Sequence, residues 1–410
     1  MLLLLHAFLL FVAFGTIIIG LTIIKKRLQM FGIFYDKMKA TATDAQGTTP
    51  LASKHTRPNT LYSADVSVIA PVRGLEEHTE ENIMSMLQQD YKNKWEVIFV
   101  VDNDDKKTRK KIREIISKAK IKNTKIIHNT LFQGSGKSSA LVAGVKHAKY
   151  PVIVSYDSDA RVRDTWLADL VAPLNNKKVG VSTGFRFYVP DSFVSYVLSV
   201  WNCVGYIAVQ RSQPFAWGGG FAIKKDLIKK LGLLDIWKKV ISDDTAVARK
   251  IEQAKMKSYF VPSCIALSYH SKFSRLTEFT TRQMAIIRWN WPSAYKTSVI
   301  MFGGSRVSII LGIIMLGAYA ITGTILFLIE AVLLLFIILI ELVIANIDFK
   351  NFAKVLGIEI GSRFKWSVAY LLGHWLMAYN ILLASRKKTI TWRGREYDFK
   401  KEAQMIEDFE

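Results

Sequence analysis

The chain has 410 residues and combines a strong positive charge with a high apolar content. Lys and Arg number 56 against 34 Asp and Glu, a net charge of +22, while half of all residues are hydrophobic. This mixture excludes a uniformly apolar transporter and predicts a polar domain joined to membrane segments. Without a zinc-finger or RNA-binding signature, no nucleic-acid partner is expected. Only two cysteines occur, Cys203 and Cys264, which excludes a disulfide framework and fits a cytosol-facing domain.

An apolar segment without Lys, Arg, Asp or Glu covers residues 2–24. Its length is sufficient to cross a bilayer. Because Lys25, Lys26 and Arg27 follow directly, we expect the next part of the chain to lie in the cytoplasm. A cleaved signal peptide would carry its positive charge before the apolar run. We therefore predict an uncleaved transmembrane anchor over residues 1–27.

Strands and helices are predicted to alternate after a linker at residues 28–64. The strands are expected at 66–70, 95–101, 125–127 and 152–155, and the helices at 80–89, 106–120 and 138–148. This alternation indicates βαβ units and a mostly parallel sheet, which binds ligands at the carboxyl ends of its strands. We assign residues 65–270 to this α/β domain.

Residues 307–347 are apolar apart from Glu330, Glu341 and Asn346. The run is too long for one membrane span, so two spans are predicted, with a turn within 317–323. A transporter or receptor would need polar groups within its spans. We expect turn or interface positions to explain the two acids, which disfavours that class of protein.

Membrane helices are thus predicted over 306–385, with residues 366–385 as a third candidate span before a basic tail at 386–410. Three C-terminal spans would place that tail outside, against the positive-inside rule. Either 366–385 lies in the membrane interface, or the hairpin is miscounted, and the sequence leaves both open. The segment 271–305 is expected to lie in the membrane interface. The aromatic stretch 193–209 is expected to lie in the interface or to be buried in the protein.

Asp157 and Asp159 form an Asp-x-Asp directly after the strand expected at 152–155. Two carboxylates at the mouth of a buried strand can share a hard divalent cation, which neutralises a nucleotide diphosphate. Paired acids at strand ends are common, so the motif alone is weak. His270 is a candidate third ligand, although a lone His is more often a surface or hydrogen-bonded residue.

Asp102 ends the second predicted strand. Its carboxylate can accept the N3–H of a uracil ring, or it can cap the following helix. The run from Gln133 to Leu141 suggests a P-loop, but Leu131 stands where the Walker pattern requires a glycine, which excludes an NTPase. A glycine turn that presents Lys137 at a helix start still suits a diphosphate.

Asp243 and Asp244 open a predicted helix at 245–253. A carboxylate there can act as a general base if it lies beside the reacting centre. Alternatively, both acids merely favour the helix N-terminus. The glycines 218–220 either allow close approach of the backbone to a ligand or form a bend.

In this order, the features resemble family 2 GT-A glycosyltransferases, and most of all the ceramide glucosyltransferase type. The similarity is carried by 66–74 with its Pro-x-Arg-Gly loop, Asp90-Tyr91, 95–97, 102–105, Arg288-Trp289 and 390–397. The resemblance implies an α/β fold of the GT-A (nucleotide-diphospho-sugar transferase) type, with transmembrane helices at both ends.

The resemblance also implies roles for individual residues. Asp244 would deprotonate the acceptor hydroxyl, and Asp157, Asp159 and His270 would hold Mg²⁺ or Mn²⁺. The nucleotide would be bound by Arg73, Asp102, Asp104, Lys137 and Asp157. The acceptor and the diphosphate would be contacted by Gly218, Gly219, Asp243, Arg288 and Trp289.

The expected function is that of an inverting membrane enzyme that moves one sugar from a UDP-sugar to a lipid hydroxyl at the cytosolic face. A family 2 polysaccharide synthase is the first alternative. It is disfavoured because Ala285 stands where the (Gln/Arg)-x-x-Arg-Trp motif of processive enzymes has Gln or Arg. A non-catalytic nucleotide-sugar-binding membrane protein is the second alternative. The aromatic stretches 193–206 and 279–295 are expected to lie against the bilayer, where Trp is favoured.

Overall fold

The computed structural model describes residues 2–43, 64–129, 135–208, 215–269, 273–392 and 395–399. Over this part, the chain divides into two compact units. The sheet unit comprises Asp36–Tyr188, Ala208–Tyr269 and Lys388–Glu410, and the helical unit comprises Met1–Tyr35, Val189–Ile207 and His270–Lys387. Each unit therefore gathers segments that are far apart in the sequence.

The described part of the sheet unit contains a seven-stranded sheet in the order β3-β2-β1-β4-β6-β5-β7. Its strands are β1 (Val66–Val72), β2 (Trp95–Asp102), β3 (Thr124–Asn129), β4 (Val152–Tyr156), β5 (Val179–Tyr188), β6 (Gly220–Lys224) and β7 (Lys257–Ser268). The helices are α2 (Thr79–Leu87), α3 (Lys106–Ala119), α4 (Gly136–His147), α5 (Trp166–Val171), the 3₁₀ turn η1 (Ala172–Asn175), α8 (Lys225–Lys230), α9 (Leu233–Trp237) and α10 (Asp243–Gln253). A C-terminal hairpin of β8 (Thr389–Trp392) and β9 (Arg395–Asp398) completes the unit.

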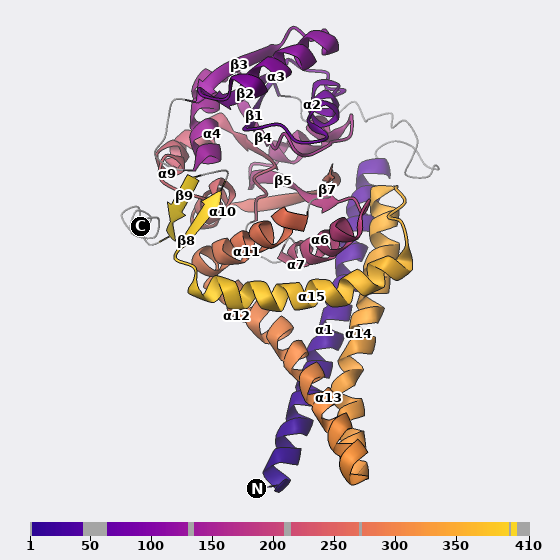
Figure 1. Cartoon of the computed structure of the whole chain (residues 1–410). Helices are drawn as coiled ribbons and strands as arrows, with labels where there is room; N and C mark the ends of the chain where they lie inside the picture. Colours follow the sequence, from indigo (N-terminus) through magenta and orange to yellow (C-terminus); the bar gives the residue numbers. More distant parts are fainter. Residues whose placement is uncertain are drawn as a thin grey trace. The chain divides into compact units, whose positions relative to one another are not determined.

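Helices cover both faces of the sheet (Figure 1). Val68 of β1 packs on the side of α2, α3 and α5, and its neighbour Ile69 packs on the side of α4, α8, α9 and α10. Successive side chains of a strand point to opposite faces, so strands covered on both sides read as continuous apolar runs. The predicted α/β architecture with a mostly parallel sheet is confirmed.

The direction of β6 determines which segments meet at one edge of the sheet. Strands β1 to β4 pair in parallel, but β6 is antiparallel to both β4 and β5. Gly220, the first residue of β6, therefore pairs with Tyr156, the last residue of β4. The residues before β6 and those after β4 consequently share the edge at which the parallel strands end.

The helical unit is built largely from α1 (Leu2–Thr43), α6 (Phe193–Cys203), α7 (Gly205–Ala208), α11 (Phe273–Asn290), α12 (Pro292–Ser298), the π-helical turn η2 (Val299–Gly303), α13 (Gly304–Thr322), α14 (Ile325–Leu356) and α15 (Arg363–Arg386). Among the described residues, four helical stretches are long and apolar enough to cross a membrane: Leu3–Met38, Pro292–Thr322, Ile325–Leu356 and Arg363–Arg386. These helices indicate membrane association, as predicted. Gly323, in the left-handed region at φ 68°, ends α13 and makes the predicted turn.

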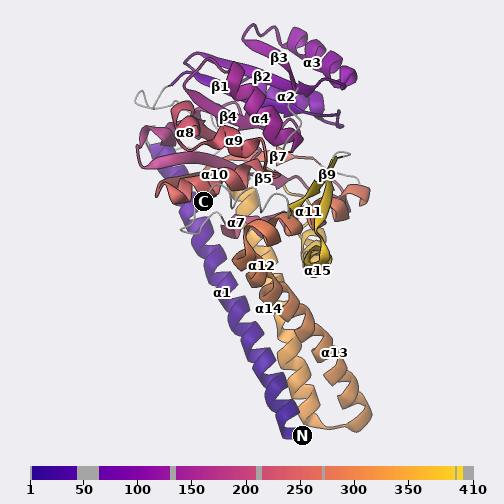
Figure 2. The same cartoon turned by 90° about the vertical axis from the view of Figure 1, so that its left-hand side faces the viewer.

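Three of these helices pack together through Leu9, Met315 and Leu334, and the fourth runs across them. In both views, α1 and α14 lie along one another and the start of α1 is at the same end as the α13–α14 turn (Figures 1 and 2), while α13 crosses α1 in Figure 1. Helix α15 runs across their axes (Figures 1 and 2). Its direction favours the interfacial alternative for residues 366–385 over a further span.

Two expectations about polar and aromatic side chains in the helical unit need correction. Glu341 lies at neither a turn nor an interface: it is buried in the middle of α14 and forms an ion pair with Arg306. Trp201 is buried with its ring 6.1 Å from that of Phe279, so it fills a packed interior rather than facing headgroups. A carboxylate buried as Glu341 is needs an ion-pair partner such as Arg306, because an unpaired buried charge is strongly destabilising.

Candidate active site

Asp157 and Asp159 follow β4 and share one guanidinium group. Arg186 Nη2 lies 3.0 Å from Asp157 Oδ2 and 2.6 Å from Asp159 Oδ1. Arg186 itself is a buried residue of β5. Burial would lower the pKa of Arg186, but the adjacent carboxylates, Asp159 above all, outweigh it and hold this pKa above its usual value. The two acids therefore converge on a single cationic position at the sheet edge.

Lys137 connects the Asp-x-Asp to the second pair of acids. It is the second residue of α4, whose N-cap Ser135 accepts a hydrogen bond from the Ser138 amide. Lys137 Nζ lies 2.6 Å from Asp157 Oδ1 and 4.0 Å from Asp243 Oδ2. Burial would lower the pKa of Lys137, but the surrounding carboxylates raise it above its usual value. The lysine is thus charged and directed at the acids rather than at solvent.

The glycines before β6 lie among these charged groups. The Gly218 amide donates to Asp244 Oδ2 at 3.0 Å, and the Gly219 carbonyl accepts from the Asp157 amide at 3.2 Å. A Cβ on Gly218 would lie 2.8 Å from Lys137 Nζ and 2.9 Å from Asp243 Oδ2. Glycine is needed here because of this close approach, and the backbone is not in the left-handed region.

Asp243 and Asp244 begin α10 in different environments. Asp244 is half-buried and accepts hydrogen bonds from the Gly218 amide, the Thr245 amide and the Ser242 hydroxyl. Asp243 is buried, and burial raises its pKa to about 7, with Lys137 opposing the rise and Asp244 adding to it. Carboxyl groups whose pKa is perturbed towards neutrality by burial and named charges are typical of functional sites.

Asp102 ends β2, where Arg73 and Asn129 hold it. Arg73 forms an ion pair with Asp102 Oδ2, and the Asn129 amide donates to Asp102 Oδ1 at 3.0 Å. The cap of α3 is Asp105, which accepts from the Thr108 amide. Asp102 therefore does not cap α3, and its contact with a nucleotide base stays a prediction. Asp104, by contrast, is exposed.

The remaining predicted site residues are His270, Arg288 and Trp289. His270 lies outside the described residues, and over the described part of the chain no group of three His, Cys, Asp or Glu side chains is placed to hold a metal. Arg288 and Trp289 belong to the helical unit. There, both donate to the Lys387 carbonyl just after α15, and Arg288 also donates to the Ala384 carbonyl. These bonds satisfy carbonyls that a helix end leaves without intrahelical partners.

Sequence reasoning missed three residues at the site. Arg186 is the only charged residue in the buried run of β5, and an arginine in such a run is itself a signal. Asn129 ends β3, the strand beside Asp102. Tyr397 of the C-terminal hairpin accepts a hydrogen bond from the Gly136 amide at 3.3 Å, next to Lys137, and no local pattern predicts that contact.

The donor set at Asp157 and Asp159 fits a divalent cation. Oxygen atoms from both side chains already converge on one nitrogen of Arg186, so one cation can contact both. Both side chains are also partly exposed, at 21% and 29%. Mg²⁺ typically takes one or two carboxylates and completes its shell with water and substrate phosphates.

Comparison with protein families decides the class of this protein. The family described as glycosyl transferase family 21 matches residues 26–405, which is well over half of the chain. The chain belongs to glycosyl transferase family 21. As a family 21 member it is a glycosyltransferase, and the predicted resemblance to GT-A enzymes of the ceramide glucosyltransferase type is confirmed.

Individual proteins similar to this family 21 chain share 27% of its sequence or less in the three cases that follow. It is 27% identical over 220 residues to the probable glycosyltransferase YdaM of Bacillus subtilis (strain 168), and the match covers 51% of each chain. The chain thus spans about half the length of this curated relative. Among solved structures, it is similar to mannosyltransferase PcManGT from Pyrobaculum calidifontis in complex with GDP-Man and Mn²⁺ (17% identity, 90% and 99% of the two chains, TM-score 0.48). It is also similar to glucosyl-3-phosphoglycerate synthase from Mycobacterium tuberculosis in complex with Mg²⁺ and uridine-diphosphate, with 15% identity over 55% of this chain and 79% of that chain and a TM-score of 0.35.

Proposed function

We propose that this glycosyltransferase is an inverting enzyme that moves one sugar from a UDP-sugar to the hydroxyl group of a lipid. The observation that carries the proposal is the contact of Lys137 with Asp157 on one side and its approach to Asp243 on the other. Lys137 thus lies between two pairs of acids. The pair Asp157 and Asp159 is suited to binding a metal ion and its diphosphate, and the pair Asp243 and Asp244 is suited to proton transfer. The cluster therefore contains the groups that a sugar transfer from a nucleotide diphosphate requires.

The proposed reaction is an in-line displacement at the anomeric carbon. Asp244 removes the acceptor proton, the acceptor oxygen forms the new bond to that carbon, and the bond to the donor's phosphate oxygen breaks to release UDP. Positioned proton transfer of this kind contributes roughly 10²- to 10⁴-fold. Hydrogen bonds from Gly218 and Ser242 hold the Asp244 carboxylate in one orientation, so that little reorganisation is needed.

Asp157 and Asp159 would hold Mg²⁺ or Mn²⁺, which, when bound, stabilises the charge on the leaving diphosphate. Lys137, charged and half-buried beside Asp157, would add a fixed positive charge to the same region. Arg186 would keep the two carboxylates in place. Asp102, oriented by Arg73 and Asn129, would accept the N3–H of the uracil ring.

A membrane location supports a lipid acceptor. A UDP-sugar is soluble, so nothing about the donor requires helices that cross a bilayer. With α1, α13 and α14 as spans and α15 in the interface, the chain after Lys25 and the basic tail after Lys387 would lie on the same side. That is the cytoplasmic side by the positive-inside rule, and we place the active site there.

The test is a lipid assay on membranes that contain the protein. Membranes are incubated with UDP-glucose or UDP-N-acetylglucosamine labelled in the sugar, and the lipids are extracted and separated by thin-layer chromatography. We expect one labelled lipid band that requires divalent cation and is lost in Asp159→Ala. Asp244→Asn should retain UDP binding but lose at least about a hundredfold in turnover. Label in a polymer would indicate a polysaccharide synthase, and wild-type turnover in Asp244→Asn would refute the mechanism.

A further inference from the structure

Arg288 and Trp289, the Arg-Trp pair of α11, have no part in the proposed mechanism, and their contacts indicate another role. Both side chains end on backbone carbonyls around the last turn of α15. Arg288 Nη1 lies 3.0 Å from the Ala384 oxygen and 3.2 Å from the Lys387 oxygen. Trp289 Nε1 lies 3.1 Å from the Lys387 oxygen, and the Arg288 guanidinium lies over the Trp289 ring. Three hydrogen bonds and a ring contact therefore direct the Arg-Trp pair to the protein's own backbone.

One face of α11 packs along α15 before the Arg-Trp pair. Thr281, Ala285 and Arg288 are spaced by four and three residues, so they share one side of the helix. Thr281 Oγ1 accepts from the Asn380 amide at 2.9 Å, and Ala285 is fully buried. The α15 residues bonded to this face have the same spacing: Asn380, Ala384 and Lys387. The small Ala285, where processive enzymes have Gln or Arg, thus suits a packed helix face.

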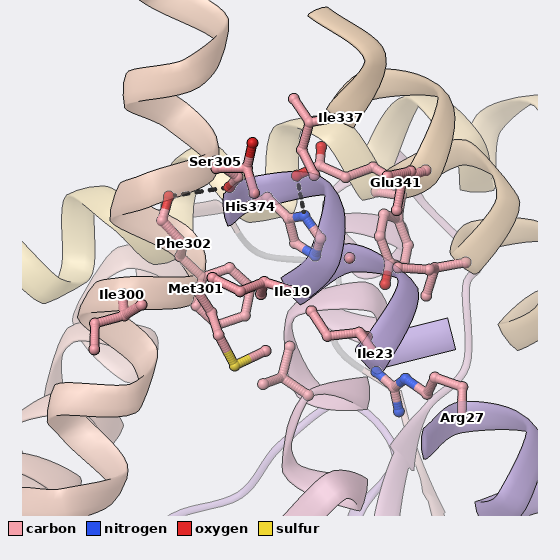
Figure 3. A pocket seen from close by; sticks show the side chains of 16 residues that line it. Ile19, Ile23, Arg27, Ile300, Met301, Phe302, Ser305, Ile337, Glu341 and His374 are labelled. Atoms are coloured by element: carbon pink, nitrogen blue, oxygen red, sulfur yellow. Dashed lines mark hydrogen bonds and ion pairs between the residues drawn. The ribbon is translucent and has the colours of Figure 1, made fainter. Parts of the chain in front are cut away.

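Helix α15 is a firm support for the Arg-Trp pair. Near its start, Trp366 Nε1 donates to the Ala345 carbonyl of α14 at 3.0 Å. In its middle, His374 Nδ1 lies 3.1 Å from Glu341 Oε1 of α14, at the pocket drawn in Figure 3. Trp366 and His374 are both buried. The helix is therefore attached at two levels to α14 and near its end to α11, so its last turn moves only if buried contacts break.

The C-terminal hairpin begins where α15 is held. The chain passes from the helical unit to the sheet unit between Lys387 and Lys388. The Lys388 carbonyl accepts from the Phe399 amide at 3.0 Å, which closes the base of the hairpin. Phe399 is buried, so this base is packed rather than loose. The Arg-Trp pair thus fixes the residue from which the hairpin starts.

Tyr397 brings the hairpin to the start of α4. Its hydroxyl accepts from the Gly136 amide at 3.3 Å, one residue before Lys137. A phenol both accepts and donates, so this hydroxyl can still donate its own proton to a phosphate oxygen. On the facing strand, Ile390 pairs with Tyr397 and is buried. The position of the hydroxyl is therefore set by the hairpin, whose starting point is set by the Arg-Trp pair.

We propose that Arg288 and Trp289 are positioning residues for donor binding. They hold the end of α15, from which the hairpin places Tyr397 beside Lys137, and they act on the donor through Tyr397 instead of by direct contact. That the donor is a UDP-sugar rests on the proposed function, whereas the hold on the hairpin does not.

A double-mutant cycle in the full-length protein in detergent micelles tests this link. The affinity for UDP in the presence of Mn²⁺ is measured by calorimetry in Arg288→Met, in Tyr397→Phe and in the double variant. Tyr397→Phe should weaken binding by roughly two- to twelvefold, the range for one hydrogen bond. Arg288→Met acts through the same bond, so its effect should not exceed this, and the double variant should bind UDP as weakly as Tyr397→Phe. Losses that multiply would show independent action and overturn the proposal.

Two further variants guard this cycle. Trp289→Phe keeps an aromatic ring and removes only the indole N–H, so it replaces Arg288→Met in the cycle if that variant does not fold. Tyr295→Phe is the matched control, because it also removes a hydrogen bond to a carbonyl of α15, that of Ile381. We expect Tyr295→Phe to bind UDP like the wild type. Equal weakening in Tyr295→Phe and Trp289→Phe would overturn a specific role for the Arg-Trp pair.

Kinetics distinguish positioning of the donor from a merely structural role and from contact with the acceptor. In Trp289→Phe, the donor KM should rise by the same factor as the UDP dissociation constant, with kcat and the acceptor KM nearly unchanged. A fall in kcat with both KM values unchanged would indicate only a loss of folded enzyme. A rise in the acceptor KM would indicate contact with the acceptor, and either result would overturn the proposal.

Limited digestion with trypsin tests the hold on the hairpin without any donor. Arg386, Lys387 and Lys388 are exposed, and cleavage after them is followed by mass spectrometry. Cleavage reports the population of the locally opened state. It should be faster in Trp289→Phe by roughly two- to twelvefold, as for one lost hydrogen bond, and unchanged in Tyr295→Phe. Unchanged cleavage in Trp289→Phe would contradict the proposed hold.

The outcomes separate this inference from the proposed function. A protein that binds UDP and shows no multiplication in the cycle, but forms no labelled lipid, would support the positioning role and refute the function. Labelled lipid together with losses that multiply would do the reverse. A protein that does not bind UDP would refute both.

Discussion

Arg186 binds both carboxylate oxygens of Asp159, with distances of 2.6 Å from Nη2 to Oδ1 and 3.1 Å from Nη1 to Oδ2. The same guanidinium reaches Asp157. A cation supplied by the protein therefore already occupies the position to which both acids point. Arg186 therefore holds the two acids in place, and a metal ion bound by these acids would compete with it for their oxygen atoms.

Arg186→Met should make the protein more dependent on divalent cation. Removing one partner of a buried ion pair costs about 3–5 kcal/mol, and less here because Asp157 and Asp159 are partly exposed. With no arginine between them, the two acids should gain more from Mn²⁺. We expect a lower melting temperature without metal and a larger rise on adding Mn²⁺ than in the wild type. An unchanged response to Mn²⁺ would mean that the acids do not bind it.

Gly218→Ala should reduce activity while leaving the fold intact. The added methyl would lie within 3 Å of both Lys137 Nζ and Asp243 Oδ2, so these groups must move. Misplacing catalytic groups by about 1 Å can cost about a hundredfold. Gly317→Ala is the matched control, because a Cβ there meets nothing within 4 Å. Turnover measured at saturating donor should fall in Gly218→Ala only, and equal turnover in both variants would contradict the proposed crowding.

The buried Asp243 should make stability depend on pH. Its pKa rises from 3.8 to about 7 in the folded protein, so the folded state retains a proton that the unfolded state has lost between these values. The stabilisation is complete below about pH 4 and is lost as the pH rises through 7. In Asp243→Asn, the melting temperature should therefore change less between pH 5 and 8 than it does in the wild type.

The exposed Asp235 provides the control for this titration. Lys238 lowers the pKa of Asp235 from 3.8, so Asp235→Asn removes a group that does not titrate between pH 5 and 8. Its pH profile of melting temperature should match that of the wild type in this range. A profile for Asp243→Asn that also matches the wild type would show that Asp243 is charged throughout.

Tyr397→Phe should weaken donor binding more than turnover. The tyrosine hydroxyl accepts from the Gly136 amide at the start of α4, one residue before Lys137. A single hydrogen bond contributes about 0.5–1.5 kcal/mol, or roughly two- to twelvefold in affinity. We expect the donor KM to rise within that range with kcat nearly unchanged. Tyr295→Phe, which removes a hydrogen bond to the Ile381 carbonyl in the helical unit, should leave the donor KM unaltered.

Much of the fold could be predicted from the sequence because its patterns are local. The strands β1, β2 and β4 are largely apolar, with Ser67, Glu96 and Ser155 as polar residues within them, and α3 is an amphipathic helix with three buried residues. The turn at Gly323 and the lengths of the apolar helices follow from composition and from the thickness of a bilayer. Asp102, Asp157 and Asp159 were found because each stands at the end of such a run.

Other features were decided only by the tertiary structure. The antiparallel direction of β6 brings Gly218 to Asp244, and the pairing of β5 brings Arg186 to Asp159. The apolar pattern of a strand does not determine its direction in the sheet or the strand beside it, because an apolar run is compatible with either orientation.

The sequence by itself therefore determined which segments are strands, which helices can cross a membrane, and which acids stand at strand ends. Only the tertiary structure decided that α15 runs across the spans and that Tyr397 reaches Gly136. The physical reason is that local periodicity selects secondary structure within a few residues. Long-range packing, by contrast, selects partners hundreds of residues apart, through burial and charge pairing that no short segment contains.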